Sequence, residues 1–255
     1  MARRRGFLVF GLVLALAIGT AAAWLAYRAS QPMQLTLRLH PFVGSQPLQL
    51  NAARYANPGG PGSFTVRDFQ FFLSNVRLVA DAGEFREPES YHLVRFDGDV
   101  GDVAVCEIVI DNVPRAAYQR IEFGIGVDAA ANGSIAPEGD LDPNGRMAWT
   151  WEVGYKFVLL EGGLVVGNDE YPLVYHVGFD ENYKPVWLEL DLDSRPAGRA
   201  ATTLDLRVDL LQMFSGSKAV DMAALPTVKF DRGDAKRLAD NYAHMVSRCG
   251  ADCRS

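Results

Sequence analysis

Hydrophobic and polar residues alternate along much of the chain with the two-residue period of a half-buried β-strand. Residues 33–40 are the clearest case, because Met33, Leu35, Leu37 and Leu39 share one face and polar side chains share the other. Further β-rich stretches follow at short spacing. They cover residues 48–54, 64–80, 91–96, 103–110, 118–127, 148–161, 171–179, 185–192 and 202–211.

A helical period replaces this alternation only near the C-terminus, where residues 233–246 place Leu238, Tyr242 and Met245 on one face. Nine or ten short strands joined by loops predict an all-β domain, an antiparallel β-sandwich or barrel-like fold with a short C-terminal helix. The chain has 255 residues and no evident linker, so we expect one β-rich domain over residues 31–255.

The N-terminal segment, residues 1–30, has the pattern of a transmembrane or signal helix. Three arginines, Arg3 to Arg5, precede an uncharged stretch from residue 6 to residue 27. At about 1.5 Å per residue that stretch is long enough to span a bilayer, and the arginines favour a cytoplasmic N-terminus. A cleaved signal peptide ending near residues 21–23 is the alternative. Both interpretations predict a periplasmic domain, either anchored to the inner membrane or released.

Charge argues against nucleic-acid binding. Four of the 25 basic residues lie in the first thirty positions, which hold no acid, so the rest of the chain carries 21 bases against 31 acids. A domain with this excess of acids repels phosphate backbones. The three cysteines, Cys106, Cys249 and Cys253, allow one disulfide in an oxidising compartment, and the pairing is left open.

The stretch from residue 147 to residue 157 is the most unusual in the chain. An extended conformation would place Met147, Trp149, Trp151 and Tyr155 on one face. One interpretation is an aromatic strand packed in the core. The other is a copper or redox site in which Met147 supplies a thioether and the tryptophans line the metal.

Histidines are scarce, and two of the four lie in strand-like stretches. His40 ends the alternating stretch on its polar face, and His176 interrupts an apolar one. Either could be an ordinary structural histidine, whereas two imidazoles converging from separate strands would suit copper. A second soft-metal candidate is the cluster His244, Met245, Cys249 and Cys253, for which a disulfide is the competing interpretation.

Enzymatic motifs are weak. The sequence contains no G-x-S-x-G, H-E-x-x-H or phosphate-binding glycine loop. Residues 140–145 begin like a calcium loop, but Trp151 stands where a bidentate glutamate is needed. We therefore expect a binding protein rather than an enzyme.

Several stretches occur in order across nearly all of the predicted β-rich domain. They are LHPFVGSQPLQL (39–50), FTVRDFQFFLSNVRL (64–78), YHLV (91–94), GRMAWTWEVGYKFVLLEG (145–162), YHVG (175–178) and LADNYAHM (238–245). Together they resemble the MbnP-like periplasmic copper-binding proteins, a family named after a member of methanobactin operons.

The resemblance implies a β-rich extracytoplasmic domain that binds Cu(I) for copper acquisition or homeostasis. It also implies a tryptophan oxidised to kynurenine beside the metal by a partner, a diheme cytochrome c peroxidase-type (MauG-like) protein. Carried onto this chain, it makes His40 and His176 the expected copper ligands, Met147 a nearby thioether, and Trp149 or Trp151 the oxidised residue. A metal-free β-sandwich that binds a ligand or mediates adhesion is the alternative function.

Overall fold

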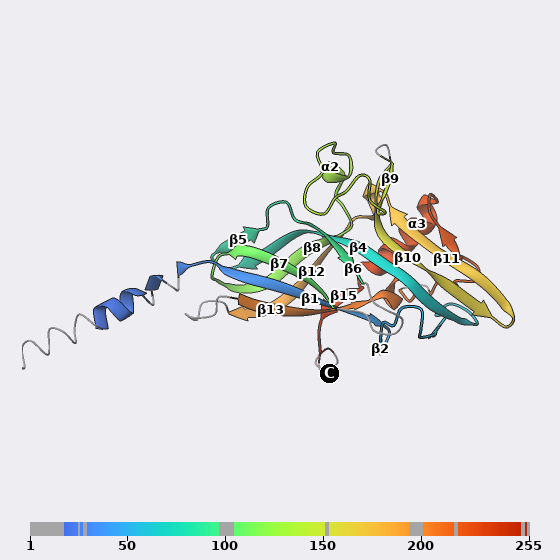
Figure 1. The fold of residues 1–255 in the computed structure, drawn as a ribbon, viewed down its shortest axis with the longest axis horizontal. Coiled ribbons are helices and arrows are strands. Elements are labelled where there is room, and N and C mark those ends of the chain that lie inside the picture. The colour runs from blue at the N-terminus through green and yellow to red at the C-terminus, as the bar shows by residue number, and fades with distance from the viewer. Residues whose placement is uncertain are drawn as a thin grey trace, which may run out of the picture.

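The chain folds into two β-sheets packed face to face. The structure is a computed structural model that describes residues 18–24, 26–27, 30–96, 105–150, 153–193, 201–216, 219–250 and 253. The smaller sheet has the order β15-β13-β1-β2, and β7 also pairs with β1, along the edge opposite β13. The larger sheet has the order β12-β8-β4-β10-β11-β14, with β3, β5 and β6 on β4 and β9 on β10 (Figure 1).

The strands and helices have the following bounds. The strands are β1 Met33–Val43, β2 Gln46–Pro47, β3 Tyr55–Ala56, β4 Ser63–Ala80, β5 Gly83–Arg86, β6 Tyr91–Arg95, β7 Cys106–Val113, β8 Ala117–Ile125, β9 Ala148–Thr150, β10 Gly154–Val166, β11 Asp169–Gly178, β12 Lys184–Asp193, β13 Ala201–Asp209, β14 Thr227–Val228 and β15 Val246–Arg248. The helices are α2 Ala129–Asn132 and α3 Arg232–Tyr242, with 3-10 turns η1 Asp180–Asn182 and η2 Leu210–Met213.

Most strand pairs are antiparallel, as the sequence predicts. Among the strands that the structure describes, two pairs are parallel: β1 with β13, and β11 with β14. Strands β1 and β13 lie near opposite ends of the chain, so almost the whole large sheet is inserted between them. No local pattern carries information about a pairing at this separation.

The main core lies between the two sheets. Leu35, Leu37 and Leu39 of β1 are fully buried and belong to the same apolar cluster as Phe71 of β4 and Tyr175 of β11. Complete burial of one such leucine contributes about 2 kcal/mol. The alternation seen in the sequence therefore corresponds to one face of β1 against this core and the other face directed outward.

A second apolar cluster covers the opposite face of the large sheet. It comprises Phe72, Tyr91, Val127, Leu141, Met147, Tyr155, Phe157 and Leu159. The loop after α2 lies over β6, where the backbone N–H of Leu93 donates to Asp140 Oδ2 over 2.8 Å. Strand β10 is consequently buried on both faces, which explains its nearly continuous apolar sequence.

Three predicted elements differ from the structure. Residues 48–54 form no strand, because Asn51 has a φ of 56° and the chain turns there. Residues 148–161 do not form one strand but the hairpin β9–β10, since Gly154 has a φ of 84°. The C-terminal helix ends at Tyr242, and Val246 belongs to β15.

The N-terminal segment is helical over residues 18–24 and 26–27. Residues 1–17, 25, 28 and 29, which complete the expected anchor or signal helix, lie outside the described part. In the part of the chain that is described, no helix combines the length and apolar character needed to cross a membrane.

Candidate functional site

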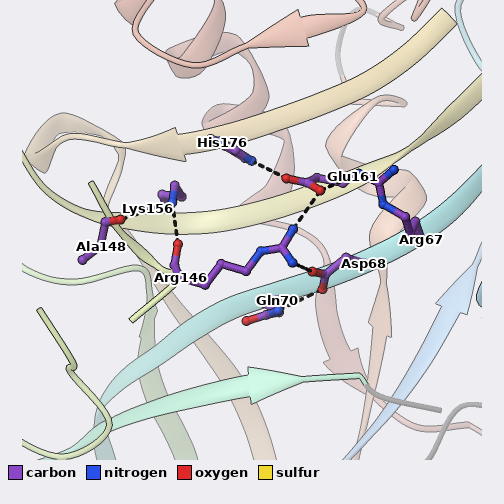
Figure 2. Close-up of polar contacts among 8 residues, drawn as sticks. All are labelled: Arg67, Asp68, Gln70, Arg146, Ala148, Lys156, Glu161 and His176. Carbon is purple, nitrogen blue, oxygen red and sulfur yellow. Dashed lines mark hydrogen bonds and ion pairs between the residues drawn. The ribbon is translucent and has the colours of Figure 1, made fainter. Parts of the chain in front are cut away.

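A polar cluster occupies the outer face of the large sheet where residues 146–150 cross β10 (Figure 2). Lys156 of β10 attaches this segment to the sheet. Its Nζ donates to the carbonyl oxygens of Arg146 and Ala148, and its backbone N–H donates to the carbonyl of Met147 over 2.6 Å. Burial, reinforced by the nearby Arg146 charge, lowers the pKa of Lys156.

His176 lies on β11 beside this segment and is paired with a carboxylate. Its Nε2 lies 2.9 Å from Oε1 of Glu161 on the neighbouring strand β10, and each side chain is only 13% exposed. Both residues point away from the main core, since Tyr175 and Val177 on either side of His176 face it. The pair therefore lies on the same face as Lys156 in Figure 2.

Two arginines also converge on Glu161. Arg67 Nη2 and Arg146 Nη2 lie 2.6 and 2.7 Å from its Oε2, and Arg146 Nη1 lies 3.0 Å from Asp68 Oδ2. Burial alone would raise the pKa of Glu161, but the hydrogen bonds from Arg67, His176 and Arg146 outweigh it and lower the pKa to about 2. Glu161 is therefore ionised at neutral pH.

An ionised Glu161 can only accept hydrogen bonds, so Nε2 of His176 carries the proton that it donates. Burial lowers the pKa of His176, against the raising effect of Glu161, and Lys156 lowers it further. The imidazole is consequently neutral at pH 7, with its lone pair on Nδ1. No hydrogen bond to Nδ1 is present among the residues that the structure describes. This is the tautomer of a histidine oriented by a carboxylate for metal binding.

Trp149 packs on β11 close to this histidine. An added Cβ on Gly178 would lie 2.7 Å from Trp149 Cζ3, which shows that the indole rests directly on that glycine. Gly178 is two residues from His176 on the same strand face, a Cα separation of about 7 Å. The indole centroid also lies 5.2 Å from the rings of Phe179 and Phe230.

Phe179 has an unusual backbone conformation at this point. Its φ is 71°, a value that non-glycine residues rarely adopt. Its ring contacts Trp149 and also the Arg232 guanidinium, whose Cζ lies 4.3 Å from the ring centroid. Strained residues of this kind are enriched at functional sites.

The structure brings some of the expected site residues together and separates others. Met147, Trp149 and His176 all belong to the region where residues 146–150 cover β10 and β11. Met147 is 3% exposed and lies in the second apolar cluster. Trp151 lies outside the described residues.

His40 lies elsewhere, on the outward face of β1 in the smaller sheet. Its Nε2 is 2.8 Å from Oδ1 of Asp205 on β13. His92 of β6 is likewise paired with Glu87 over 2.8 Å. No contact joins His40 to His176 in the described part of the chain. Nor does any group of three or more His, Cys, Asp or Glu side chains there have the arrangement of a metal site. The ligand roles of His40 and His176 remain predictions.

Two members of the C-terminal candidate cluster (His244, Met245, Cys249 and Cys253) form a disulfide. Cys249 and Cys253 are bonded to each other, Met245 is fully buried in the core, and His244 is exposed. The thiols are therefore unavailable to a metal while the disulfide is intact.

Sequence reasoning missed Lys156, Glu161 and the two arginines of the cluster. A signal for the first two was present, since both are charged residues inside an otherwise apolar strand, where burial requires a partner. The arginines carried no comparable signal, because their contacts depend on strand register and on the hairpin β9–β10.

These features define a two-sheet β-protein in which a histidine–carboxylate cluster lies on β10 and β11, beside the aromatic segment that leads into β9. The chain belongs to the MbnP family, whose sequence model matches residues 32–230.

A solved structure with a similar fold is MbnP from Methylosinus trichosporium. The TM-score is 0.53 at 16% sequence identity, and the match covers 75% of this chain and 80% of that one. At this identity the similarity shows the fold alone. No curated protein sequence matches the chain.

Proposed function

We propose that this protein is a copper(I)-binding protein of the cell envelope, without catalytic activity, which serves copper acquisition or homeostasis. The main observation in support of this proposal is the protonation and hydrogen bonding of His176. A buried neutral imidazole donates Nε2–H to an ionised Glu161 and keeps the Nδ1 lone pair for a ligand. Membership of the MbnP family and the fold shared with a methanobactin-associated protein support it.

The segment beside His176 carries a second type of donor that Cu(I) accepts. Imidazole and thioether are soft or borderline donors, and Met147 supplies a thioether on the segment fixed by Lys156. The other carboxylate-paired histidine with a predicted ligand role is His40, on the smaller sheet. We treat His40 as a second candidate whose contribution is measured separately.

We further propose Trp149 as the residue converted to kynurenine by a diheme cytochrome c peroxidase-type partner. Its support is the contact with Gly178, on the same strand face as His176. Two molecules of hydrogen peroxide would each transfer one oxygen atom to the indole and leave one water, which gives N-formylkynurenine. Hydrolysis of its formyl group by one water would then give kynurenine and formate. Peptide mass spectrometry after co-expression tests this step, with Trp149→Phe as the control. Modification of Trp151 instead would contradict it.

The proposed location is the periplasm, with the N-terminal helix as an anchor or a removed signal. The arginine triplet followed by an uncharged stretch supports export, and the Cys249–Cys253 disulfide is typical of an oxidising compartment. Cell fractionation and N-terminal sequencing of the mature protein distinguish anchoring, cleavage and retention in the cytoplasm.

The decisive experiment is a Cu(I) competition titration on the exported domain under anaerobic conditions. We expect one-to-one binding that His176→Ala weakens strongly. His40→Ala is measured in parallel to determine whether it belongs to the same site. His244→Ala is the matched control, because His244 is exposed and takes no part in the polar cluster around His176. Wild-type affinity in the His40→Ala, His176→Ala double variant would exclude these histidines as ligands.

A second candidate function is a metal-free binding module, and one cavity favours it. A hollow of about 480 Å³ beside β9 is lined mainly by apolar groups, among them Ile135, Pro137, Pro143 and Tyr155. Ligand pockets commonly have this size and character. Metal content after mild purification separates the two functions, since a binding module contains no stoichiometric copper.

A further inference from the structure

A second hollow, here called the β12 hollow, lies on the outer face of the large sheet, over β12, β8, β4 and β5. Its volume is about 330 Å³, within the range of small-molecule sites. Strands β8 and β4 lie between β12 and β10 in the sheet. The β12 hollow is therefore separate from the polar cluster around His176, and no described residue of that cluster lines it.

One row of side chains crosses four neighbouring strands at the base of this hollow. Trp187 of β12 lies opposite Glu122 of β8 in the register. Glu122 in turn lies opposite Arg77 of β4, and Arg77 lies opposite Arg86 of β5. Strands are about 4.8 Å apart, so the row is roughly 14 Å long. The row faces outward, because the residues on either side of it in β12, β8 and β4 pack in the main core.

Trp187 presents a large apolar surface to solvent at one end of this row. It is 59% exposed, an unusual degree for the largest apolar side chain, and it lines the hollow. No hydrogen bond to its indole N–H is present among the described residues. An accessible indole offers a flat, electron-rich face for stacking and one N–H donor at its edge.

The charges of the row are compensated by ion pairs within the sheet. Arg77 pairs with Glu122 and, over 2.8 Å, with Glu84. Arg86 pairs through Nε with the same Glu84 over 2.7 Å. Glu122 also pairs over 2.7 Å with Arg120, which does not line the hollow. The β12 hollow thus lacks the unpaired charge that would select an ion, and its chemistry favours a neutral, polar ligand.

Hydrogen-bonding groups nevertheless remain accessible around the hollow. Arg86 is largely exposed, and its terminal nitrogens have no partner in the described part of the chain. Asn75 is exposed too, and its Nδ2 donates to the Tyr183 hydroxyl over 3.1 Å and to Asp128 over 2.8 Å. These bonds orient the amide and leave its Oδ1 as a free acceptor.

Tyr183 gives this part of the wall a fixed shape. An added Cβ on Gly124 would lie 2.2 Å from Cε2 of Tyr183, so the ring rests directly on the backbone of β8. The wall is therefore formed before a ligand arrives, which lowers the entropic cost of binding.

We propose that the β12 hollow binds a neutral oligosaccharide, with one sugar ring stacked on Trp187 and its hydroxyls on Arg86 and Asn75. The C–H face of a pyranose packs on the electron-rich face of an indole. Each sugar hydroxyl both donates and accepts, which suits the donors of Arg86 and the acceptor of Asn75. The row is long enough for several sugar units. The proposal does not depend on copper binding.

The test is isothermal titration of the full-length protein, prepared without copper, in a detergent whose head group is not a sugar. The neutral probes are cellotetraose, N-acetylchitotetraose and mannotetraose, and tetragalacturonate is the acidic counterpart. We expect at least one neutral probe to bind with a dissociation constant of about 1 mM or lower, and more tightly than tetragalacturonate. Binding should also shift the tryptophan emission to shorter wavelength, because Trp187 becomes covered.

Variants locate the binding. Trp187→Ala should weaken it roughly tenfold or more, and Trp187→Phe should retain part of the affinity but lose the fluorescence shift. Phe230→Ala is the matched control, because Phe230 is also an exposed aromatic residue, at 61%, and does not line the hollow. Arg86→Gln should weaken binding several-fold, whereas Arg237→Gln, at an exposed position of α3, should not. Thermal unfolding of each variant separates lost binding from lost folding.

The other outcomes decide against the proposal. Failure of all three neutral probes to bind at about 10 mM overturns it. Wild-type affinity in Trp187→Ala, or an equal loss in Phe230→Ala, overturns the location. Tighter binding of tetragalacturonate than of every neutral probe overturns the assignment to neutral sugars. Because copper is absent throughout, failure here leaves the copper titration with His176→Ala unaffected.

Discussion

Nε2 of His176 donates a hydrogen bond to Oε1 of Glu161 across the strands β10 and β11, over 2.9 Å. This contact joins a residue with a predicted metal-binding role to one that the sequence did not single out. It fixes the imidazole tautomer, and Glu161 in turn is held by Arg67 and Arg146. A histidine with such a partner is oriented before any ligand arrives.

Removing this partner should weaken copper binding without removing a ligand. We expect Glu161→Ala to lower Cu(I) affinity roughly 10- to 100-fold, the usual effect of losing a residue that orients a metal-binding histidine. Competition titration measures the change. Glu170→Ala, at an exposed position of β11, is the control and should have wild-type affinity. Full affinity in Glu161→Ala would show that orientation of His176 is irrelevant to copper.

The same carboxylate should stabilise the fold. Glu161→Gln keeps the shape of the side chain but leaves Arg67 and Arg146 without their shared negative charge. Because Glu161 is only 13% exposed, we expect a loss of about 1–3 kcal/mol in the free energy of unfolding. Urea unfolding at pH 7 checks this value. A loss no larger than that of Glu170→Gln contradicts it.

The hydrogen bond from Tyr91 to Asp128 should stabilise the fold to a degree that depends on pH. The Tyr91 hydroxyl donates to Asp128 Oδ2 over 2.6 Å. Burial raises the pKa of Asp128, but the hydrogen bonds from Tyr91, Asn75 and two backbone N–H groups outweigh it and lower the pKa below 3.8. The unfolded state therefore binds the proton more readily, and this stabilisation is present above pH 3.8 and lost as pH falls through the folded pKa.

We accordingly expect Tyr91→Phe to cost about 1.5 kcal/mol at pH 7 and distinctly less near pH 3. Urea unfolding at both pH values measures the difference. Tyr171→Phe on β11 is the control and should show no such dependence on pH. An equal cost of Tyr91→Phe at pH 7 and pH 3 would contradict the role of the ionised Asp128.

The contact of Trp149 with β11 predicts a specific sensitivity at Gly178. A Cβ there would lie 2.7 Å from the indole and 2.4 Å from the carbonyl oxygen of Tyr155. We expect Gly178→Ala to destabilise the protein by about 1–3 kcal/mol and to change tryptophan fluorescence. Gly163→Ala on β10 is the matched control, since its nearest neighbours would be 3.7 and 3.9 Å away. Equal stability of the two variants would contradict this packing.

The Cys249–Cys253 disulfide should have little effect on the affinity for Cu(I). Cys249 and Cys253 close a loop with a sequence separation of 4, so replacing both by serine should cost about 2 kcal/mol or less. Cu(I) affinity should remain unchanged, because the described cluster around His176 contains neither residue. A large fall in affinity would instead assign copper to the C-terminal thiols in their reduced form.

Much of the secondary structure was predictable, because it follows from local periodicity. The alternation of residues 33–40 predicts β1, and the long β-rich stretch after residue 63 predicts β4, almost residue by residue. The predicted strands were wrong where a single backbone angle changes the direction of the chain. The positive φ of Gly154 folds the aromatic stretch back on itself, and that of Asn51 prevents a strand.

The site could be predicted only in part, since it depends on neighbours distant in the sequence. The residue types of His176, Met147 and Trp149 indicated metal chemistry, and the structure brings these three into one region. Nothing local indicated that His40 would lie on the other sheet, paired with Asp205. Which strands become neighbours is decided by packing of the two sheets around their common core.

The sequence by itself determined the β-rich class of the domain, its acidic charge and its resemblance to the MbnP family. Residue period, composition and short motifs are properties of a chain segment and need no partner. The tertiary structure alone decided the parallel pairing of β1 with β13, the ionised Glu161 beside His176 and the convergence of Arg67 and Arg146 on Glu161. Each of these depends on register between strands and on burial, which exist only after distant segments have packed together.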